Sequence, residues 1–259
     1  MGFDLLLLIL IALIGGVCIT TIGPGGIFVT IALYAIMMLD PGTVAGTASA
    51  MFIATGAVGS LAYLRSGHLE GQTARHAAYI LSGASVIGAF SGAQINALLD
   101  VYTFGLLLGG FVILTGLIIL IREWRGLATV DAFDLGSTRS WMIMALVGVL
   151  VGLPGGLLGV GGPVLAVPLL VVLGLPMLMA LALAQVQSIF ISLFATVGYA
   201  IQGTIDWWLV LVLGIPLIIG TVGGWWVAQR INPSRLKLVL GLVLLALGIH
   251  LLTGGAVPN

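Results

Sequence analysis

The stretch Ile22-Gly23-Pro24-Gly25-Gly26-Ile27 and its near copy Leu158-Gly159-Val160-Gly161-Gly162-Pro163, 136 positions later, decide the fold of this chain. Both lie inside long apolar segments, where consecutive glycines interrupt a helix. An unpaired backbone amide or carbonyl in hydrocarbon costs several kcal/mol, so irregular backbone occurs there only where protein or a water-filled cavity satisfies it. Paired interruptions at equivalent places of a duplicated chain therefore indicate the substrate site of a transporter.

The composition of the chain points to a membrane protein. Of its 259 residues, 61% are apolar and only 6% are charged, and the mean hydropathy is +1.30. Soluble domains carry about 25% charged residues, so we predict an integral membrane protein. The net charge is zero and no basic patch is present, so nucleic acid is not an expected partner. The one cysteine, Cys18, cannot form an internal disulfide and is expected to be a small buried residue.

The two halves resemble each other beyond the glycine runs. At an offset of 136 positions Tyr63 corresponds to Tyr199, and after a four-residue deletion the offset becomes 132 and Gly88 corresponds to Gly220. Other pairs that keep these offsets are Gly16 with Gly152, Leu33 with Leu169, Gly67 with Gly203, Gly92 with Gly224, Gly109 with Gly241 and Gly116 with Gly248. We therefore predict one membrane domain made of a first repeat (1–121), a connecting loop (122–139) and a second repeat (140–259).

Ten apolar blocks supply the membrane elements. They cover roughly 3–22, 27–39, 42–64, 75–97, 102–121, 140–158, 163–174, 177–201, 207–228 and 235–252. Most approach the ~20 residues that cross a ~30 Å hydrocarbon core as a helix. The blocks 27–39 and 163–174 would be only about 18–20 Å long. The first block lacks the positive flank of a cleaved signal peptide and is expected to be retained.

The basic residues decide how many blocks cross, because Lys and Arg that flank membrane spans prefer the cytoplasm. They occur in three stretches, 65–75, 122–139 and 230–237. If the short blocks cross, each repeat has five elements and the three stretches share one side. If they do not, each repeat has four spans and the third stretch lies opposite the others. We therefore predict an all-α polytopic membrane protein of two inverted five-element repeats, with a cytoplasmic connecting loop and both termini outside. A re-entrant path for the short blocks is the alternative.

Each glycine run precedes a short helix, so free backbone N–H groups and the positive end of the helix dipole point into the interruption. Such an end binds anions without a buried cation. The glycines that we assign to the substrate site on this ground are Gly23, Gly25, Gly26, Gly159, Gly161 and Gly162. The spaced pairs Gly88/Gly92 and Gly220/Gly224 are instead predicted to be helix-packing positions.

Polar side chains follow each short block. Uncharged donors at matching depth can complete the hydrogen bonds of an oxyanion, and at offset 136 Ser49 falls opposite Gln185. The polar residues that we assign to the substrate site are Thr47, Ser49, Gln185, Gln187 and Ser188. Thr43 and Thr55 are expected to bond back to their own helix instead.

The acidic residues all lie in loops or at segment ends. Pumps and cation transporters generally keep ionisable residues within the membrane, so neither a metal-cation substrate nor a metal site is expected. Asp40 and Asp206 are candidates for proton coupling, although a helix cap or turn is the stronger interpretation. Since the chain has no HExxH motif, paired-Asp motif, nucleophile elbow or dinucleotide fingerprint, we predict that it is not an enzyme and needs no cofactor.

Both glycine runs resemble the repeated glycine motif of the sulfite exporter TauE/SafE family, and Gly46-Thr47-Ala48-Ser49 is similar to the family's small-residue and Thr-Ser stretch. The resemblance covers nearly the whole chain. It implies an inner-membrane carrier of sulfur oxyanions or organosulfonates such as sulfite or sulfoacetate, often in the export direction. Proline replaces a glycine in the first run, and Gln185-Val186-Gln187-Ser188 stands where the family often has a simpler Thr-Ser pattern, which leaves the substrate open. Related thiosulfate carriers use cysteines, so with Cys18 alone that mechanism is not expected.

These observations favour a secondary transporter that exports sulfite, sulfonates or related sulfur oxyanions across the inner membrane by alternating access. The expected partners are the small anion, membrane lipid and, as a candidate coupling ion, the proton; a homo-oligomer is a candidate assembly. Two alternatives remain open. One is a passive anion channel, and the other is a membrane subunit that binds a partner and transports nothing.

Overall fold

The structure is a computed structural model that describes residues 2–66, 72–124, 137–228, 230 and 234–253. Within these residues it contains ten helices and no strand. The helices are α1 (Gly2–Thr21), α2 (Gly26–Ala35), α3 (Pro41–Arg65), α4 (Gln72–Asn96), α5 (Val101–Trp124), α6 (Thr138–Leu158), α7 (Pro163–Val172), α8 (Met177–Gln202), α9 (Trp207–Ala228) and α10 (Ser234–Leu252).

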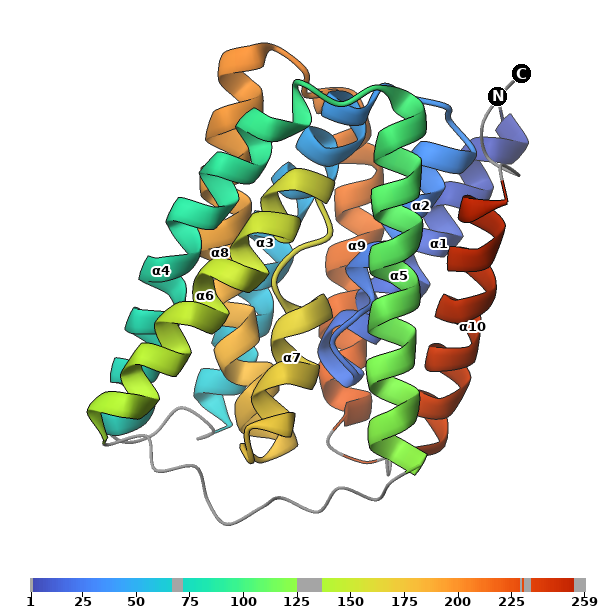
Figure 1. Ribbon diagram of the computed structural model, residues 1–259. Helices are drawn as coiled ribbons and strands as arrows, with labels where there is room; N and C mark the ends of the chain where they lie inside the picture. The colour runs from blue at the N-terminus through green and yellow to red at the C-terminus, as the bar shows by residue number, and fades with distance from the viewer. Residues whose placement is uncertain (1, 67–71, 125–136, 229, 231–233, 254–259) are drawn as a thin grey trace.

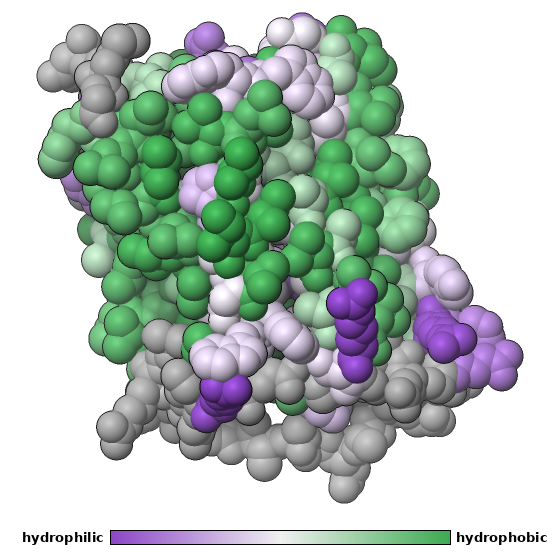
Figure 2. All heavy atoms as spheres, turned by 180° about the vertical axis from the view of Figure 1, so that it is seen from behind, coloured by the Kyte–Doolittle hydropathy of each residue, from purple (hydrophilic) through white to green (hydrophobic). Residues whose placement is uncertain are grey.

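The prediction of an all-α membrane protein with short helices after the glycine runs is confirmed. Seven helices are long and apolar enough to cross a bilayer: α1, α3, α4, α5, α6, α8 and α9. The helices α2 and α7 have ten residues each, which is about 15 Å or half of a ~30 Å hydrocarbon core. Figure 2 shows an apolar surface over the middle of the bundle, with hydrophilic side chains gathered near its ends.

The path of the chain explains how such short helices fit. α1 enters from the end of the bundle where α10 finishes, turns at the first glycine run, and α2 returns to the end from which α1 came (Figure 1). α6 and α7 form a corresponding hairpin from the opposite end (Figure 1). Residues 19–27 and 158–168 are all buried, so both turns lie inside the protein. Each short helix therefore reaches from the interior to one end, and each half contributes five elements.

The helix packing has the same pattern in both halves. The most extensive contacts join α4 to α6, α1 to α9, α5 to α10 and α3 to α8. In the second half, α6 corresponds to α1 and α9 corresponds to α4, so the α4–α6 and α1–α9 pairs are equivalent. The pairs α5–α10 and α3–α8 each join two corresponding helices. Corresponding helices also run in opposite directions (Figure 1). This arrangement supports the predicted inverted repeats, which remain a prediction together with their boundaries at 121 and 140; residues 125–136 of the connecting loop lie outside the described residues.

The spaced glycines are helix-packing positions, as predicted. A Cβ atom placed on Gly220 would lie 2.1 Å from the carbonyl oxygen of Leu13, and one on Gly88 would lie 2.6 Å from that of Val149. Leu13 and Val149 are themselves 136 positions apart. The absence of a side chain thus lets α9 approach α1, and α4 approach α6, to backbone contact.

Two buried tyrosines satisfy the broken helix ends in the same way in each half. The Tyr63 hydroxyl of α3 donates to the carbonyl oxygen of Thr20, in the last turn of α1, at 2.5 Å. The Tyr199 hydroxyl of α8 donates to the carbonyl oxygen of Gly156, in the last turn of α6, at 2.7 Å. Carbonyls in the last turn of a helix lack partners within the helix, and in hydrocarbon no water replaces them. These bonds therefore stabilise both interruptions.

We expect Gly220→Ala to lower the thermal stability of the purified protein, because the added methyl group would force α1 and α9 apart. Overpacking of this kind costs about 1–3 kcal/mol, and each kcal/mol lowers Tm by about 2–4 °C in a protein of this size. The measurement is Tm in detergent. Gly223→Ala is the matched control, since nothing lies within 4 Å of that position in the same helix. An equal Tm for the two variants would contradict the packing role.

Candidate substrate site between the two helix breaks

The two interruptions meet at one small buried cavity. Its volume is about 10 Å³, and it is lined by Ile19, Gly23, Gly26, Phe52, Thr55, Val160, Gly161, Pro163 and Ser188. α2 begins at Gly26 and α7 begins at Pro163, so the N-terminal ends of both short helices reach the cavity from opposite ends of the bundle. None of these lining residues carries a charge.

The interruptions are in direct contact. A Cβ atom on Gly26 would lie 3.2 Å from the carbonyl oxygen of Val160, and one on Gly23 would lie 3.0 Å from that of Pro163. Gly23 has a φ of +113° and Gly161 a φ of +74°, in the region that favours glycine. Glycine is therefore required here both for backbone conformation and for close approach.

Backbone N–H groups are available at the start of each short helix. In α2 the amide of Phe28 bonds to the carbonyl of Gly25 at 3.3 Å, and within the described residues no backbone carbonyl accepts from Gly26 or Ile27. In α7 the amide of Ala166 bonds to the carbonyl of Gly162 at 3.1 Å, and within the described residues no backbone carbonyl accepts from Val164 or Leu165. Together with the positive ends of two helix dipoles, such groups make an anion-binding environment.

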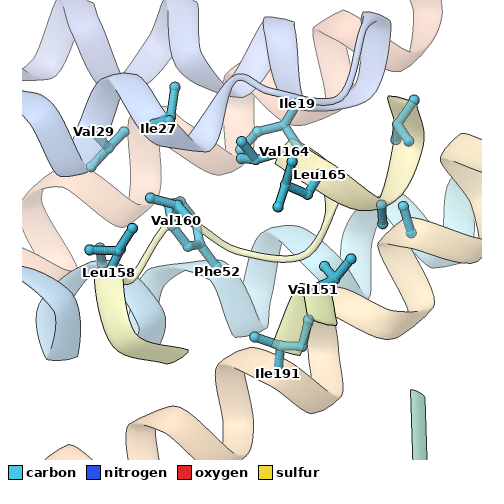
Figure 3. Packing of buried hydrophobic residues seen from close by; sticks show 14 of the residues in the cluster. Ile19, Ile27, Val29, Phe52, Val151, Leu158, Val160, Val164, Leu165 and Ile191 are labelled. Carbon is cyan, nitrogen blue, oxygen red and sulfur yellow. The ribbon is translucent and has the colours of Figure 1, made fainter. Parts of the chain in front are cut away.

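The ring of Phe52 lies between the two glycine runs. Its Cζ atom would be 2.9 Å from a Cβ on Gly26, and its Cδ2 atom 3.3 Å from a Cβ on Gly161. Figure 3 shows Phe52 of α3 beside Val160 of the α6–α7 interruption. Phe52 was not among the predicted site residues. The repeat register could have found it, because Phe52 and Ser188 are 136 positions apart.

Four of the predicted site residues line the cavity: Gly23, Gly26, Gly161 and Ser188. Gly162 lies next to them, since its Cβ would be 3.2 Å from the backbone of Ser188. Thr55, which was expected only to bond to its own helix, does so through the carbonyl of Phe52 at 3.2 Å and also lines the cavity.

Two of the predicted glycines pack against other helices instead. The Gly25 amide bonds to the carbonyl of Gly23 at 2.9 Å, and its Cβ would lie 2.1 Å from the carbonyl oxygen of Gly15 in α1. Gly159 ends α6 with a φ of +63°, and its Cβ would be 2.5 Å from Ala45 of α3. These two positions build the interruptions rather than face the cavity.

The predicted hydroxyl groups of α3 also lie away from the cavity lining. The Thr47 hydroxyl oxygen accepts a hydrogen bond from the amide of Asp206 at 3.0 Å, at the start of α9. Ser49 is buried, but it does not belong to the lining.

The two glutamines of α8 are fully buried but do not line the cavity. Gln185 donates from Nε2 to the carbonyl of Ile19, a lining residue, at 3.2 Å. Its Oε1 has no partner among the described residues, and neither does either polar atom of Gln187. Gln185 thus supports the end of α1 behind the cavity. Gln187 is a buried amide whose hydrogen-bonding capacity is unused in this state.

The sequence comparisons agree with this architecture. The family model described as "Sulfite exporter TauE/SafE" matches residues 8–251. Among curated proteins, the chain is 25% identical to the probable membrane transporter protein YdhB of Bacillus subtilis (strain 168) over 91% of this chain and 93% of that protein. It is 28% identical to a probable membrane transporter protein of Xylella fastidiosa (strain 9a5c) over 89% of this chain and 87% of that protein. A second Bacillus subtilis protein, the probable membrane transporter protein YunE, is 25% identical over 96% of this chain and 97% of its own length.

No solved structure matches the chain. The family match nevertheless covers almost all of the sequence, including both glycine runs, the whole of α2 to α9 and most of α1 and α10. The chain therefore belongs to the sulfite exporter TauE/SafE family.

Proposed function

We propose that this protein is a secondary transporter that exports sulfite, sulfonates or related sulfur oxyanions across the cell membrane, the inner membrane where there are two. The observation that carries the proposal is the meeting of two helix N-termini, from opposite ends of the bundle, at one uncharged buried cavity. An oxyanion there accepts hydrogen bonds from backbone N–H groups and from neighbouring hydroxyls such as that of Ser188. Family membership supports the same substrate class.

The closed cavity favours a carrier over the alternative of a passive channel. Its volume of about 10 Å³ is close to the minimum that holds one water molecule. A sulfur oxyanion is larger than a water molecule, and the ring of Phe52 fills the space between the interruptions. Substrate entry therefore needs the halves to rearrange around the site, as alternating access requires.

The distribution of charge favours export. The helix ends that flank the three basic stretches share one end of the bundle, while the connections bearing Asp40, Asp100 and Asp206 lie at the other (Figure 1). By the positive-inside rule the basic end is cytoplasmic and both termini are outside. A basic face raises the local concentration of anions and an acidic face lowers it. This field helps anions to load from the cytoplasm and to leave outside.

Purified protein in liposomes is expected to transport sulfite or sulfoacetate with saturable kinetics, because each cycle carries a bound anion. Radiotracer or dye-coupled uptake should be compared for sulfite, sulfoacetate, taurine, sulfate and acetate, with and without a pH gradient. Substrate on the far side should accelerate flux in a carrier. Non-saturating flux without such trans-stimulation would instead indicate the channel. No flux of any of these anions from folded, inserted protein would favour the partner-subunit alternative.

Gly161→Ala is expected to reduce that flux by roughly tenfold or more, the factor that 1.4 kcal/mol gives. The new methyl group would lie 3.3 Å from Phe52 and 3.6 Å from the Ser188 hydroxyl. Gly203→Ala is the matched control, because Gly203 has nearly the same φ, +72°, but nothing within 4 Å. Both variants carry similar backbone strain, so they should have similar Tm values. An equal loss of flux in both would remove Gly161 from the site.

A further inference from the structure

One hydrogen bond joins the short helix of the first half to the interruption of the second half. The Thr30 hydroxyl, in the middle of α2, donates to the carbonyl oxygen of Gly159 at 2.6 Å. Both residues are buried, and Thr30 is 0% exposed. Figure 3 shows that α2, with Ile27 and Val29 labelled, lies alongside this interruption. The bond therefore connects two segments, far apart in the sequence, that both reach the cavity.

The Gly159 carbonyl depends on Thr30 for its hydrogen bond. In a continuous helix it would accept from the amide four residues later, but that residue is Pro163, which has no N–H. Among the described residues, no backbone amide donates to it. A buried carbonyl without a donor is costly in hydrocarbon. The Thr30 hydroxyl therefore stabilises the second interruption in its present position.

The corresponding place in the first half is built differently. Gly23 corresponds to Gly159, and its carbonyl accepts from the amide of Gly25, inside the same interruption, at 2.9 Å. Thr30 corresponds to Ala166, whose side chain has no hydrogen-bond donor. The first interruption thus satisfies its carbonyl within itself, whereas the second takes its donor from the opposite half.

The two interruptions also differ in backbone conformation. Gly25 has a φ of −71°, and the corresponding Gly161 has a φ of +74°. In a carrier built from inverted repeats, the two opposite states are related by exchanging the conformations of the halves. After such an exchange the Gly159 carbonyl would accept within its own interruption, and Ala166 would have no hydroxyl to give to the first one. The bond from Thr30 to Gly159 therefore belongs to only one of the two states.

We propose that the Thr30 hydroxyl is a latch, a hydrogen bond that holds the second interruption against α2 while the cavity is closed and breaks when the cavity opens. The present cavity of about 10 Å³ is too small for a sulfur oxyanion, so every state that admits one is more open. Release of Gly159 frees Val160 and Gly161, which form part of the cavity wall. Thr30 is thus a positioning residue that acts through the interruption. The inference rests on the proposed transport by alternating access.

The first test measures opening of the cavity without measuring transport. Ser188→Cys is made in a Cys18→Ala background, which leaves one thiol in the chain and places it in the cavity wall. Mass spectrometry of the purified protein then gives the rate at which a small anionic methanethiosulfonate reagent modifies this thiol. Thr30→Val, which has nearly the same shape but no donor, is expected to raise the rate about two- to tenfold, the factor that one hydrogen bond gives. Thr30→Ser keeps a hydroxyl and should restore the slow rate.

Thr20→Val is the matched control. Thr20 is equally buried, and its hydroxyl donates to the carbonyl of Thr221 at 2.8 Å, so this variant also loses one buried hydrogen bond. That bond joins α1 to α9, which pack closely and would move together. The control is therefore expected to lower Tm without changing the labelling rate. If Thr30→Val does not fold, Thr30→Ala replaces it, because the second half has Ala166 at the corresponding position.

Three results would overturn the latch: an unchanged labelling rate in Thr30→Val, an equal increase in Thr20→Val, or a fast rate that persists in Thr30→Ser. The second test is anion flux in liposomes with Thr30→Val in the otherwise native chain. Its KM should fall by the factor by which labelling rises, because more of the protein is able to bind the anion. Faster labelling in a protein that carries none of the anions would refute the proposed function and leave the latch standing. Flux with an unchanged KM would refute the role of the latch in transport.

Discussion

Every main feature of this protein follows from the need to satisfy backbone polar groups where a helix stops inside hydrocarbon. The last turn of α1 and that of α6 would leave carbonyl groups without partners, and no water is available there to replace them. Tyr63 and Tyr199 supply the missing donors from the two central helices, α3 and α8. The starts of α2 and α7, where N–H groups are free, lie at a shared buried cavity instead of against lipid. The N–H groups left free at each break are the groups that the proposed anion site would use.

Glycine carries out a second task outside the breaks. At Gly88 and Gly220 the absence of a side chain lets two helix backbones come into contact. The residues that they contact, Val149 and Leu13, occupy corresponding positions of the two halves. The pairs α1 with α9 and α4 with α6 are therefore closely packed along their length. The short helix α2 contacts chiefly α1 and α3, and α7 contacts chiefly α8, α5 and α6. In the proposed alternating access, these closely packed pairs would be the bodies that move around the cavity.

The sequence predicted most of the fold but only part of the site. Runs of consecutive glycines, short blocks and the spacing of basic residues were enough to predict the helices, the breaks and five elements in each half. A run of glycines does not determine its own backbone angles, so the sequence alone does not say which glycine faces the cavity. Gly23 has a φ of +113° and faces the cavity, whereas Gly25 has a φ of −71° and packs on α1. One residue on a helix turns the side chain by about 100°, which separates Ser188 in the cavity wall from Gln187 outside it. These assignments need the tertiary packing.

Phe52 and Ser188 occupy corresponding places in the two halves, but one is a large aromatic ring and the other a small hydroxyl. A carrier with identical halves would have inward-open and outward-open states of equal energy, and neither would be preferred at rest. Each difference between the halves removes that degeneracy, and about 1.4 kcal/mol is enough to populate one state ten times more than the other. In the proposed carrier, the aromatic ring on one side of the site and the hydroxyl on the other would therefore give the empty protein a resting orientation. In such a carrier, the two similar halves allow the site to face either side of the membrane. The sequence differences between the halves determine which of the two orientations the empty protein adopts.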